Sequence, residues 1–159
     1  MFQENFMVGV DKMEFSRYMV DNALNLLKRE YYKILLVDLT NDVFEPIIVN
    51  QKEWENLPKV DNSISFFFEW FITSDDIYRK DREAFHRFVN LSHLRKLFNK
   101  SPKEYYFMYR RVINGDFKWV MLKLIPSEHY SRDHQEIMLY VKDIDKVYTD
   151  EYHRLLRTI

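Results

Sequence analysis

Histidine is the residue type in this chain best suited to hold a metal ion, and five are present. His86 and His93 lie seven positions apart in an expected helix, and two helical turns, or ~10 Å, are too long a spacing to chelate one ion. His129 and His134 fall in or beside an expected loop. His86 could serve as a lone haem ligand, but an ordinary surface histidine is the preferred interpretation on a partly exposed helix. The sequence therefore predicts no metal site and requires no cofactor.

Paired carboxylates are the other residues suited to chemistry, as general acids and bases. Asp75 and Asp76, and likewise Asp143 and Asp145, lie at expected helix starts, where carboxylates accept hydrogen bonds from free backbone amides. Capping is therefore the preferred interpretation of both pairs. Cysteine is absent and only two glycines are present, which excludes thiol chemistry and a glycine-rich phosphate loop. We predict no catalytic residue and no enzymatic activity.

The composition is that of one folded domain. The chain has 159 residues, of which 47% are hydrophobic and 17% aromatic, and a chain of this length buries ~70% of its unfolded surface. A net charge of -1 gives no electrostatic reason to expect nucleic acid or an anionic membrane as a partner. Residues 1–10 do not resemble a signal peptide, and the sequence contains no run of ~20 apolar residues. We expect a cytoplasmic protein without membrane insertion in this segment.

A hairpin over residues 104–125 is the clearest structural pattern. Asn114 and Gly115 stand between two β-favouring runs, and this dipeptide supplies the positive φ angles of a tight turn. A two-residue loop places Arg110 opposite Trp119 and makes both hairpin faces apolar, so that both need a cover. We expect one face to lie under the helices, and it carries Phe107, Tyr109, Val120 and Leu122.

The remaining elements follow from the spacing of apolar residues. Intervals of three and four predict a helix over 11–30. Pro46 cannot donate to a ladder, so the strand over 43–50 is expected at the sheet edge or with a bulge. Asp81 is the expected N-cap of a helix. The other expected elements are strands over 31–39 and 135–143, a short helix within 63–76, and helices over 81–100 broken near 90–92.

Four short motifs resemble those of PAS domains, sensory modules of bacterial signalling proteins. Residues 81–85 resemble the Asp-Asp-Arg-x-x-Phe start of their long helix, although residues 78–80 replace the usual His-Pro before it. Residues 109–120 are similar to their Tyr-Arg, Asn-Gly and Trp-Val hairpin. Residues 37–39 and 143–145 resemble the ends of their first and last strands.

The resemblance covers about 31–145 and implies an α+β fold. In this fold a five-stranded antiparallel sheet carries helices on one face, with an N-terminal helical extension over 1–30 and the start of a C-terminal signalling helix over 146–159. The family supplies input modules of diguanylate cyclases and sensor kinases, whose catalytic motifs are absent here, so the resemblance implies an output domain outside this chain. The implied signal relay residues are Asp143, Asp145, Tyr148, Tyr152 and Leu155.

Three functions stay open at this stage. The first is a sensory and dimerisation module, because the heptad-like spacing that ends at Ile159 indicates pairing with a second copy or a longer parent chain. The second is a small-molecule receptor of unknown ligand, although aromatic crowding predicts a nearly filled core. The third is a small α+β enzyme using a buried carboxylate at Glu69 or Asp38. The candidate pocket residues are Phe66, Phe67, Trp70, Phe85, Phe107, Tyr109, Val120 and Leu122.

Overall fold

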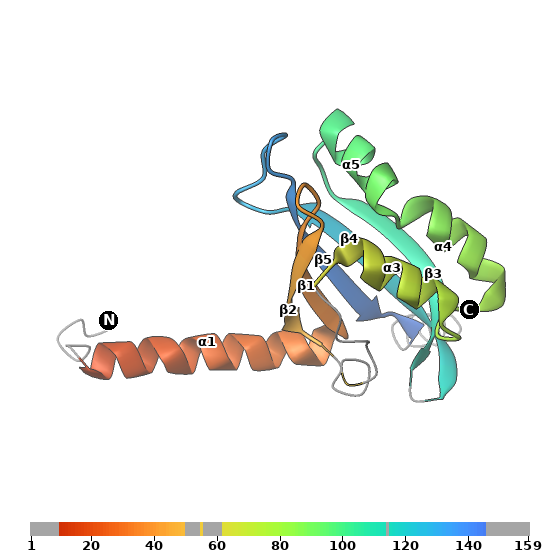
Figure 1. Ribbon diagram of the computed structural model, residues 1–159. Coiled ribbons are helices and arrows are strands. Elements are labelled where there is room, and N and C mark those ends of the chain that lie inside the picture. The colour runs from red at the N-terminus through yellow and green to blue at the C-terminus, as the bar shows by residue number, and fades with distance from the viewer. Residues whose placement is uncertain (1–9, 50–54, 56–61, 114, 146–159) are drawn as a thin grey trace, which may run out of the picture. The chain divides into compact units, whose positions relative to one another are not determined.

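A computed structural model describes residues 10–49, 55, 62–113 and 115–145 (Figure 1). The chain divides into two compact units, Met1–Glu30 and Tyr31–Ile159. The described residues of the first unit form the helix α1 (Val10–Glu30), at the place the spacing predicted. Large apolar side chains of α1 are exposed, with 67% of Tyr18 and 55% of Leu26 accessible. Within the described ranges, no helix is long and apolar enough to cross a membrane.

The second unit contains the five antiparallel strands that the sequence predicted. Their spatial order is β2-β1-β5-β4-β3, and every neighbouring pair is antiparallel. The first and last strands along the chain therefore do not sit at the two edges; β2 and β3 do. The strands are β1 (Lys33–Asp38), β2 (Val43–Ile48), β3 (Tyr105–Ile113), β4 (Asp116–Pro126) and β5 (Glu136–Asp143).

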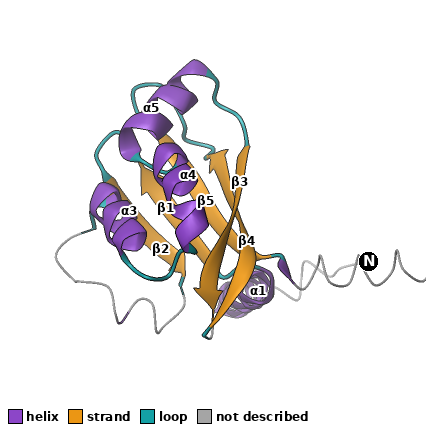
Figure 2. Cartoon of the chain, turned by 90° about the vertical axis from the view of Figure 1, so that its right-hand side faces the viewer, coloured by secondary structure: helices purple, strands orange, loops and turns teal. Residues whose placement is uncertain are grey.

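Three helices cover one face of this sheet, as Figure 2 shows. Two begin with a side-chain cap: the backbone N–H of Phe66 donates to Ser63 Oγ over 3.1 Å, and that of His93 donates to Asn90 Oδ1 over 2.8 Å. Asn90 therefore marks the predicted helix break. The helices are α3 (Ile64–Thr73), α4 (Arg82–Phe88) and α5 (Leu91–Lys100), with a short 3₁₀ turn, η2 (Arg79–Asp81), before α4.

The predicted hairpin register is confirmed. Arg110 pairs with Trp119, and Ile113 pairs with Asp116 across the turn. Gly115 has φ +86°, the positive angle that a tight turn needs there. Asn114 lies outside the described residues. The hairpin therefore places alternate side chains on opposite faces, as expected from the turn alone.

β2 is an edge strand, as Pro46 predicted. Pro46 pairs with Leu35 while Ile48 pairs with Ile34, which leaves Ile47 as an extra residue on β2. This extra residue is a bulge one position beyond the proline. The edge and the bulge were offered as alternatives, and both are present.

The core lies between the sheet and the three helices. The predicted inward side of the hairpin is correct, because Tyr109, Val120 and Leu122 are at most 2% exposed and belong to the core cluster. Phe107 is partly buried against the same cluster. Burying apolar side chains stabilises a fold by ~1.5–3 kcal/mol each. One face of the hairpin thus forms part of the hydrophobic core.

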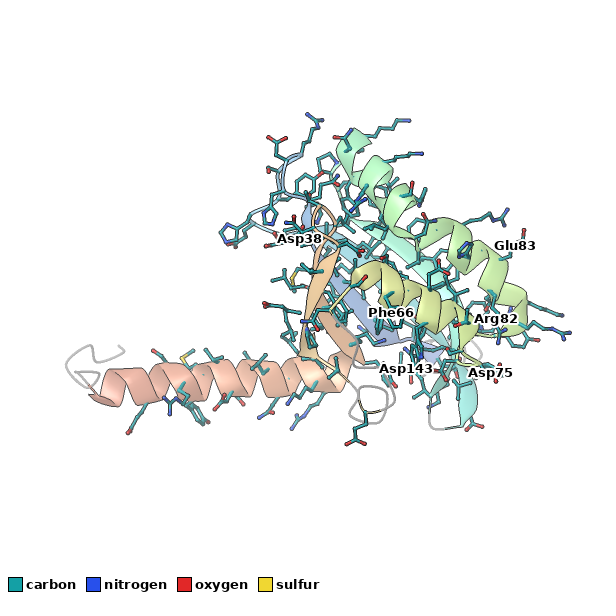
Figure 3. All side chains as sticks on the ribbon, viewed as in Figure 1. Asp38, Phe66, Asp75, Arg82, Glu83 and Asp143 are labelled. Atoms are coloured by element: carbon teal, nitrogen blue, oxygen red, sulfur yellow. The ribbon has the colours of Figure 1, made fainter. Side chains whose placement is uncertain are left out.

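Asp75 and Asp76 do not lie at a helix start, which corrects the capping interpretation. The carboxylate of Asp75 is fully exposed and accepts a hydrogen bond from Arg82 over 3.2 Å, and Figure 3 labels both residues. The carbonyl of Asp76 accepts from the backbone N–H of Val112 over 2.7 Å. Residues 76–78 thus lie along the edge of β3, because Tyr78 also donates its N–H to the Arg110 carbonyl. The pair helps to fix a loop on the sheet.

Candidate functional site

Aromatic rings fill the space between α3, α4 and the hairpin. The ring of Phe85 lies 4.8 Å from Tyr109, 5.7 Å from Phe71 and 6.0 Å from Phe107, measured between centroids. The rings of Phe88 and Phe107 stack at 5.1 Å. Edge-to-face and stacked pairs at such distances contribute ~0.5–1.5 kcal/mol each beyond burial. The predicted aromatic wall therefore packs chiefly against itself.

A cavity of about 20 Å³ remains within this packing. That volume holds one water molecule, whereas a pocket for an organic ligand measures ~300–1,000 Å³. The nearly filled core matches the expectation from aromatic crowding. Ten residues surround the cavity, and they are Lys33, Phe67, Phe68, Phe71, Phe85, Val89, Tyr109, Leu122, Leu139 and Val141.

Four of the eight predicted pocket residues are in that lining, namely Phe67, Phe85, Tyr109 and Leu122. The other four lie elsewhere. Phe66 is 41% exposed on the outer side of α3 (Figure 3), and Val120 is fully buried in the core. Trp70 and Phe107 are partly buried against the core cluster. The structure thus brings half of the predicted set together around this small cavity.

Two buried cations border the cavity region, and neither was predicted from the sequence. Lys33 is 3% exposed, with Nζ 4.8 Å from the Phe67 ring centroid and 5.0 Å from that of Phe71. Arg111 is 1% exposed, with Cζ 4.6 Å from the Tyr32 centroid and 4.7 Å from that of Phe71. Cations over ring faces in a desolvated site gain up to ~2 kcal/mol. Phe71 therefore takes part in both cation–π contacts.

The inward position of these two cations could have been predicted from the alternation of side chains along the strands. Arg111 lies between the inward residues Tyr109 and Ile113 at a spacing of two, and Lys33 lies two before the inward Leu35. Period two places all of these on one face. The inward placement of Arg111 and Lys33 thus followed from the same rule that placed Tyr109.

A second cluster joins the start of α4 to the hairpin. The Asp81 carboxylate accepts hydrogen bonds from the backbone N–H of Arg110 over 2.9 Å and from its Nε and Nη2 over 2.9 and 2.8 Å. Asp81 occupies the N-cap position of α4, as predicted, but its side chain makes no capping hydrogen bond there. The Arg110 guanidinium holds the pKa of Asp81 below its usual range. The pair is a bidentate, charge-assisted contact.

Arg110 also carries the contact to β4. Its guanidinium carbon lies 4.2 Å from the Tyr78 ring centroid and 4.6 Å from that of Trp119. The predicted guanidinium–indole contact is therefore confirmed, with Tyr78 as a second ring. The side chain of Arg110 is 31% exposed, so each contact is a partly solvated one.

Trp119 in turn holds the end of β5. The backbone N–H of Ile144 donates to the Trp119 carbonyl over 3.0 Å, and the Trp119 N–H donates to Asp145 Oδ1 over 3.2 Å. Asp143 Oδ1 accepts from the N–H of Asp145 over 3.1 Å, and its Oδ2 lies 3.8 Å from Lys118 Nζ. Asp143 and Asp145 therefore meet the hairpin directly.

The predicted relay residues Tyr148, Tyr152 and Leu155, like Ile159, lie outside the described residues. The rest of the relay set, Asp143 and Asp145, lies in the cluster just described. We call the connected set Asp81, Arg110, Trp119 and Asp145 the relay cluster. It links the start of α4 to the end of β5 through the hairpin.

The carboxylates considered for enzymatic chemistry do not line the cavity. Glu69 is exposed, and His86 Nδ1 lies 4.0 Å from its carboxylate. Asp38 accepts from the Asn41 side chain over 2.8 Å, and His134 Nε2 lies 3.2 Å from it. Burial raises the pKa of Asp38, but the hydrogen bonds from Asn41 and His134 outweigh burial and lower it overall. No cluster of three or more metal-ligating side chains occurs among the described residues.

Comparisons with known proteins find matches among solved structures. No family model matches the sequence, and no curated protein matches it. Among solved structures, the N-terminal domain of a diguanylate cyclase with a PAS/PAC sensor from Marinobacter aquaeolei is 14% identical, with a TM-score of 0.47, covering 73% of this chain and 97% of that one. The PAS domain of Bordetella pertussis BvgS is 13% identical with a TM-score of 0.46, covering 94% and 99%.

A third similar structure is a sensory box histidine kinase/response regulator from Burkholderia thailandensis. It is 14% identical with a TM-score of 0.44, and the similarity covers 80% of this chain and 91% of that one. Two of the three structures carry PAS in their descriptions.

Proposed function

We propose that this chain is a non-catalytic sensory and dimerisation module of a bacterial, cytoplasmic signal-transduction protein. It would pass its signal through the C-terminal helix to an output domain, a diguanylate cyclase or a kinase. The observation that carries this proposal is the relay cluster, since one continuous set of hydrogen bonds and ring contacts runs from Asp81 to Asp145. A change at the helices would therefore reach the segment that leaves the sheet.

The relay acts through a small shift of packed elements. Movement of α4 against the hairpin displaces Asp81, and Arg110 follows because three hydrogen bonds join the two residues. The Arg110 guanidinium lies over the Trp119 ring, so a shift of Arg110 displaces Trp119. The backbone of Trp119 in turn forms hydrogen bonds with Ile144 and Asp145. A signal that favours one position of α4 biases the direction in which the chain leaves β5.

Hydrogen exchange of the full chain, read by mass spectrometry, tests this relay. In D81N the charge-assisted bonds to Arg110 weaken, and we expect the amides of Trp119, Ile144 and Asp145 to exchange about tenfold faster, as a loss of ~1.4 kcal/mol in local stability predicts. The matched control is E83Q, a change at an exposed α4 side chain outside the relay cluster. Unchanged exchange at the end of β5 in D81N, despite faster exchange at Arg110, would refute the relay.

A small-molecule receptor is the second candidate, favoured by one observation. Lys33 brings a buried cation to the lining of the cavity, and polar groups in an apolar interior are typical of ligand sites. The eight predicted pocket residues stay a prediction, and a ligand would have to expand the cavity of about 20 Å³. Native mass spectrometry decides: extra mass per subunit that disappears on denaturation supports a receptor, and a bare subunit argues against one.

A further inference from the structure

Basic residues concentrate in one stretch of the chain, although the net charge is only -1. Between Arg79 and Lys103 there are eight basic residues and two acidic ones, so the rest of the chain has an excess of seven acidic residues. The stretch contains η2, α4 and α5, which follow one another along the helical side of the sheet (Figure 1). This uneven distribution gives an electrostatic reason for an anionic partner that the net charge did not give.

Five of these eight cations are exposed and have no acidic partner. Arg82 pairs with an aspartate, Arg95 donates to a backbone carbonyl, and Lys103 lies over a tyrosine ring. The other five are exposed, and in the described part of the chain none of them enters an ion pair. We call these five residues the basic strip, and they are Arg79, Lys80, Arg87, Lys96 and Lys100.

Stabilisation of the helices does not account for the whole basic strip. Because of the helix dipole, a cation is favourable beside the end of a helix and unfavourable beside its start. Lys100 lies in the last turn of α5, where it is favourable. Arg79 and Lys80 lie directly before α4, where they are not. An anion outside the chain would offset this local cost.

The basic strip follows a line. Lys96 and Lys100 are four residues apart and share one side of α5, whereas Leu94 and Phe98 of the same helix are buried in the core. α4 and α5 contain seven and ten residues, or about 25 Å along their axes at ~1.5 Å per residue. The neighbouring α3 has no basic residue, and its Glu69 is exposed. The cations therefore do not cover the whole helical face.

A line of cations fits the phosphate backbone of a double helix. Phosphates of one DNA strand follow one another every ~3.4 Å along the axis, so about 25 Å faces about seven of them. A flat anionic membrane would also meet Glu69 of α3. Within the described range 62–113, η2, α4 and α5 expose no large hydrophobic side chain. A protein partner is held by apolar and aromatic anchors and a single strand by stacking on rings, whereas phosphate contacts need neither.

We propose that the basic strip binds the phosphate backbone of double-stranded DNA, independently of the base sequence. Lysine and arginine side chains form ion pairs with phosphate oxygens, and the DNA releases its bound cations. Glu83 is exposed on α4 between Arg79 and Arg87 (Figure 3), and its carboxylate opposes the phosphates. This activity goes beyond the proposed sensory function, and neither the relay cluster nor dimerisation enters it.

Fluorescence anisotropy with a short labelled DNA duplex and the full chain tests the proposal. We expect a dissociation constant of about 1–100 µM near physiological salt. Five phosphate contacts should give a slope of about −4.5 for the logarithm of the association constant against that of the salt concentration. The affinity should therefore fall about 500-fold between about 50 and 200 mM salt. No binding at the lower concentration, or a slope shallower than about −2, would overturn the proposal.

Neutralising two residues of the basic strip assigns the contact. K96Q/K100Q removes two phosphate contacts, so the slope should change to about −2.7 and binding at low salt should weaken by about tenfold or more. The matched control is K28Q/R29Q, a double neutralisation at exposed positions of α1, which should leave the slope unchanged. An equal loss in both variants would mean that only the total charge matters, and it would overturn the assignment to the basic strip.

E83Q gives a result that partial unfolding cannot imitate. It removes the acidic side chain that lies among the cations of α4, so repulsion of the phosphates decreases and the affinity should rise about threefold. Unchanged or weaker binding would contradict a contact between α4 and DNA.

Competition separates DNA from other anionic partners. The competitors are unlabelled duplex, poly-L-glutamate, and phosphatidylcholine vesicles with about one-third phosphatidylglycerol, each at the same concentration of negative charge. Unlabelled duplex should displace the labelled DNA at the lowest concentration, because it carries one charge per ~1.7 Å of its axis. Equal displacement by poly-L-glutamate or by the vesicles would overturn DNA as the partner and would assign the basic strip to an acidic protein or to a membrane.

Discussion

The two faces of the β3–β4 hairpin carry similar residues but differ in burial. On the inner face Tyr109 and Leu122 are at most 2% exposed and belong to the core. On the outer side Tyr106 and Phe117 are just over half exposed. Composition alone does not distinguish them, since both sides are rich in aromatic residues. The difference teaches that hydrophobicity shows only that a face needs a cover, whereas the helices packed against one face decide which face becomes the core.

The largest effect should come from the inner face. In F85A the contacts with the rings of Phe71, Phe107 and Tyr109 are lost, and removing a buried phenylalanine destabilises a protein by ~3–5 kcal/mol. Urea denaturation measures this change in the free energy of unfolding. The matched variant F117A removes an exposed ring that touches Tyr78 and should cost less than ~1 kcal/mol. Equal losses would contradict the contrast between the faces.

The next effect concerns two Asp–Arg pairs of different exposure. D81N weakens the partly buried pair with Arg110, in which the aspartate side chain is 16% exposed, and should cost ~1.5–3 kcal/mol. D75N weakens the pair with Arg82, in which the aspartate is fully exposed, and should cost less than ~1 kcal/mol. Chemical denaturation of both variants at neutral pH provides the measurement. A larger loss of unfolding free energy in D75N than in D81N would contradict the greater contribution assigned to the Asp81–Arg110 pair.

The pH dependence of stability sharpens the same contrast. The pKa of Asp81 is lowered in the folded state, so its contribution is fully present above the unfolded value, near 3.8, and is lost as the pH falls through the folded pKa. The difference in unfolding free energy between the native chain and D81N should therefore be constant above pH ~5 and shrink below pH ~4. Urea midpoints measured across this range test it. A difference that widens on acidification has the wrong sign for a lowered pKa.

The smallest effect lies in the turn that holds both faces in register. Gly115 has φ +86°, and a Cβ placed there meets no atom within 4 Å. G115A should therefore cost ~1–2 kcal/mol through backbone strain alone. G115N should cost less, because asparagine tolerates positive φ. Thermal unfolding of both variants provides the comparison, and an alanine variant as stable as the native chain would show that the turn relaxes.

Local patterns predicted much of the fold. Asn114 and Gly115, together with strand alternation, predicted the register, the strand pairing and the inward side of the hairpin. Pro46 predicted the edge strand. These features depend on neighbours close in sequence, where periodicity and turn chemistry act directly. The division into 1–30, 31–145 and 146–159 stays a prediction.

Long-range side-chain pairs could not be predicted in this way. Asp81 was expected to cap its own helix, but its carboxylate binds Arg110, twenty-nine residues further along the chain. Arg111 and Lys33 were overlooked because a basic residue on an inward strand position is unusual. Which acid meets which base depends on the assembled tertiary structure, and local propensity carries no information about it.

The two edges of the sheet have a consequence for solubility. On β2 the residue Pro46 lacks an N–H, and the bulge at Ile47 disturbs the ladder. On β3 residues 76–78 occupy the hydrogen-bonding groups of Arg110 and Val112. Neither edge therefore offers a continuous template on which strands of other molecules can add. Strands of separate molecules add at open edges when fibres grow, so blocking both edges disfavours such growth at high concentration.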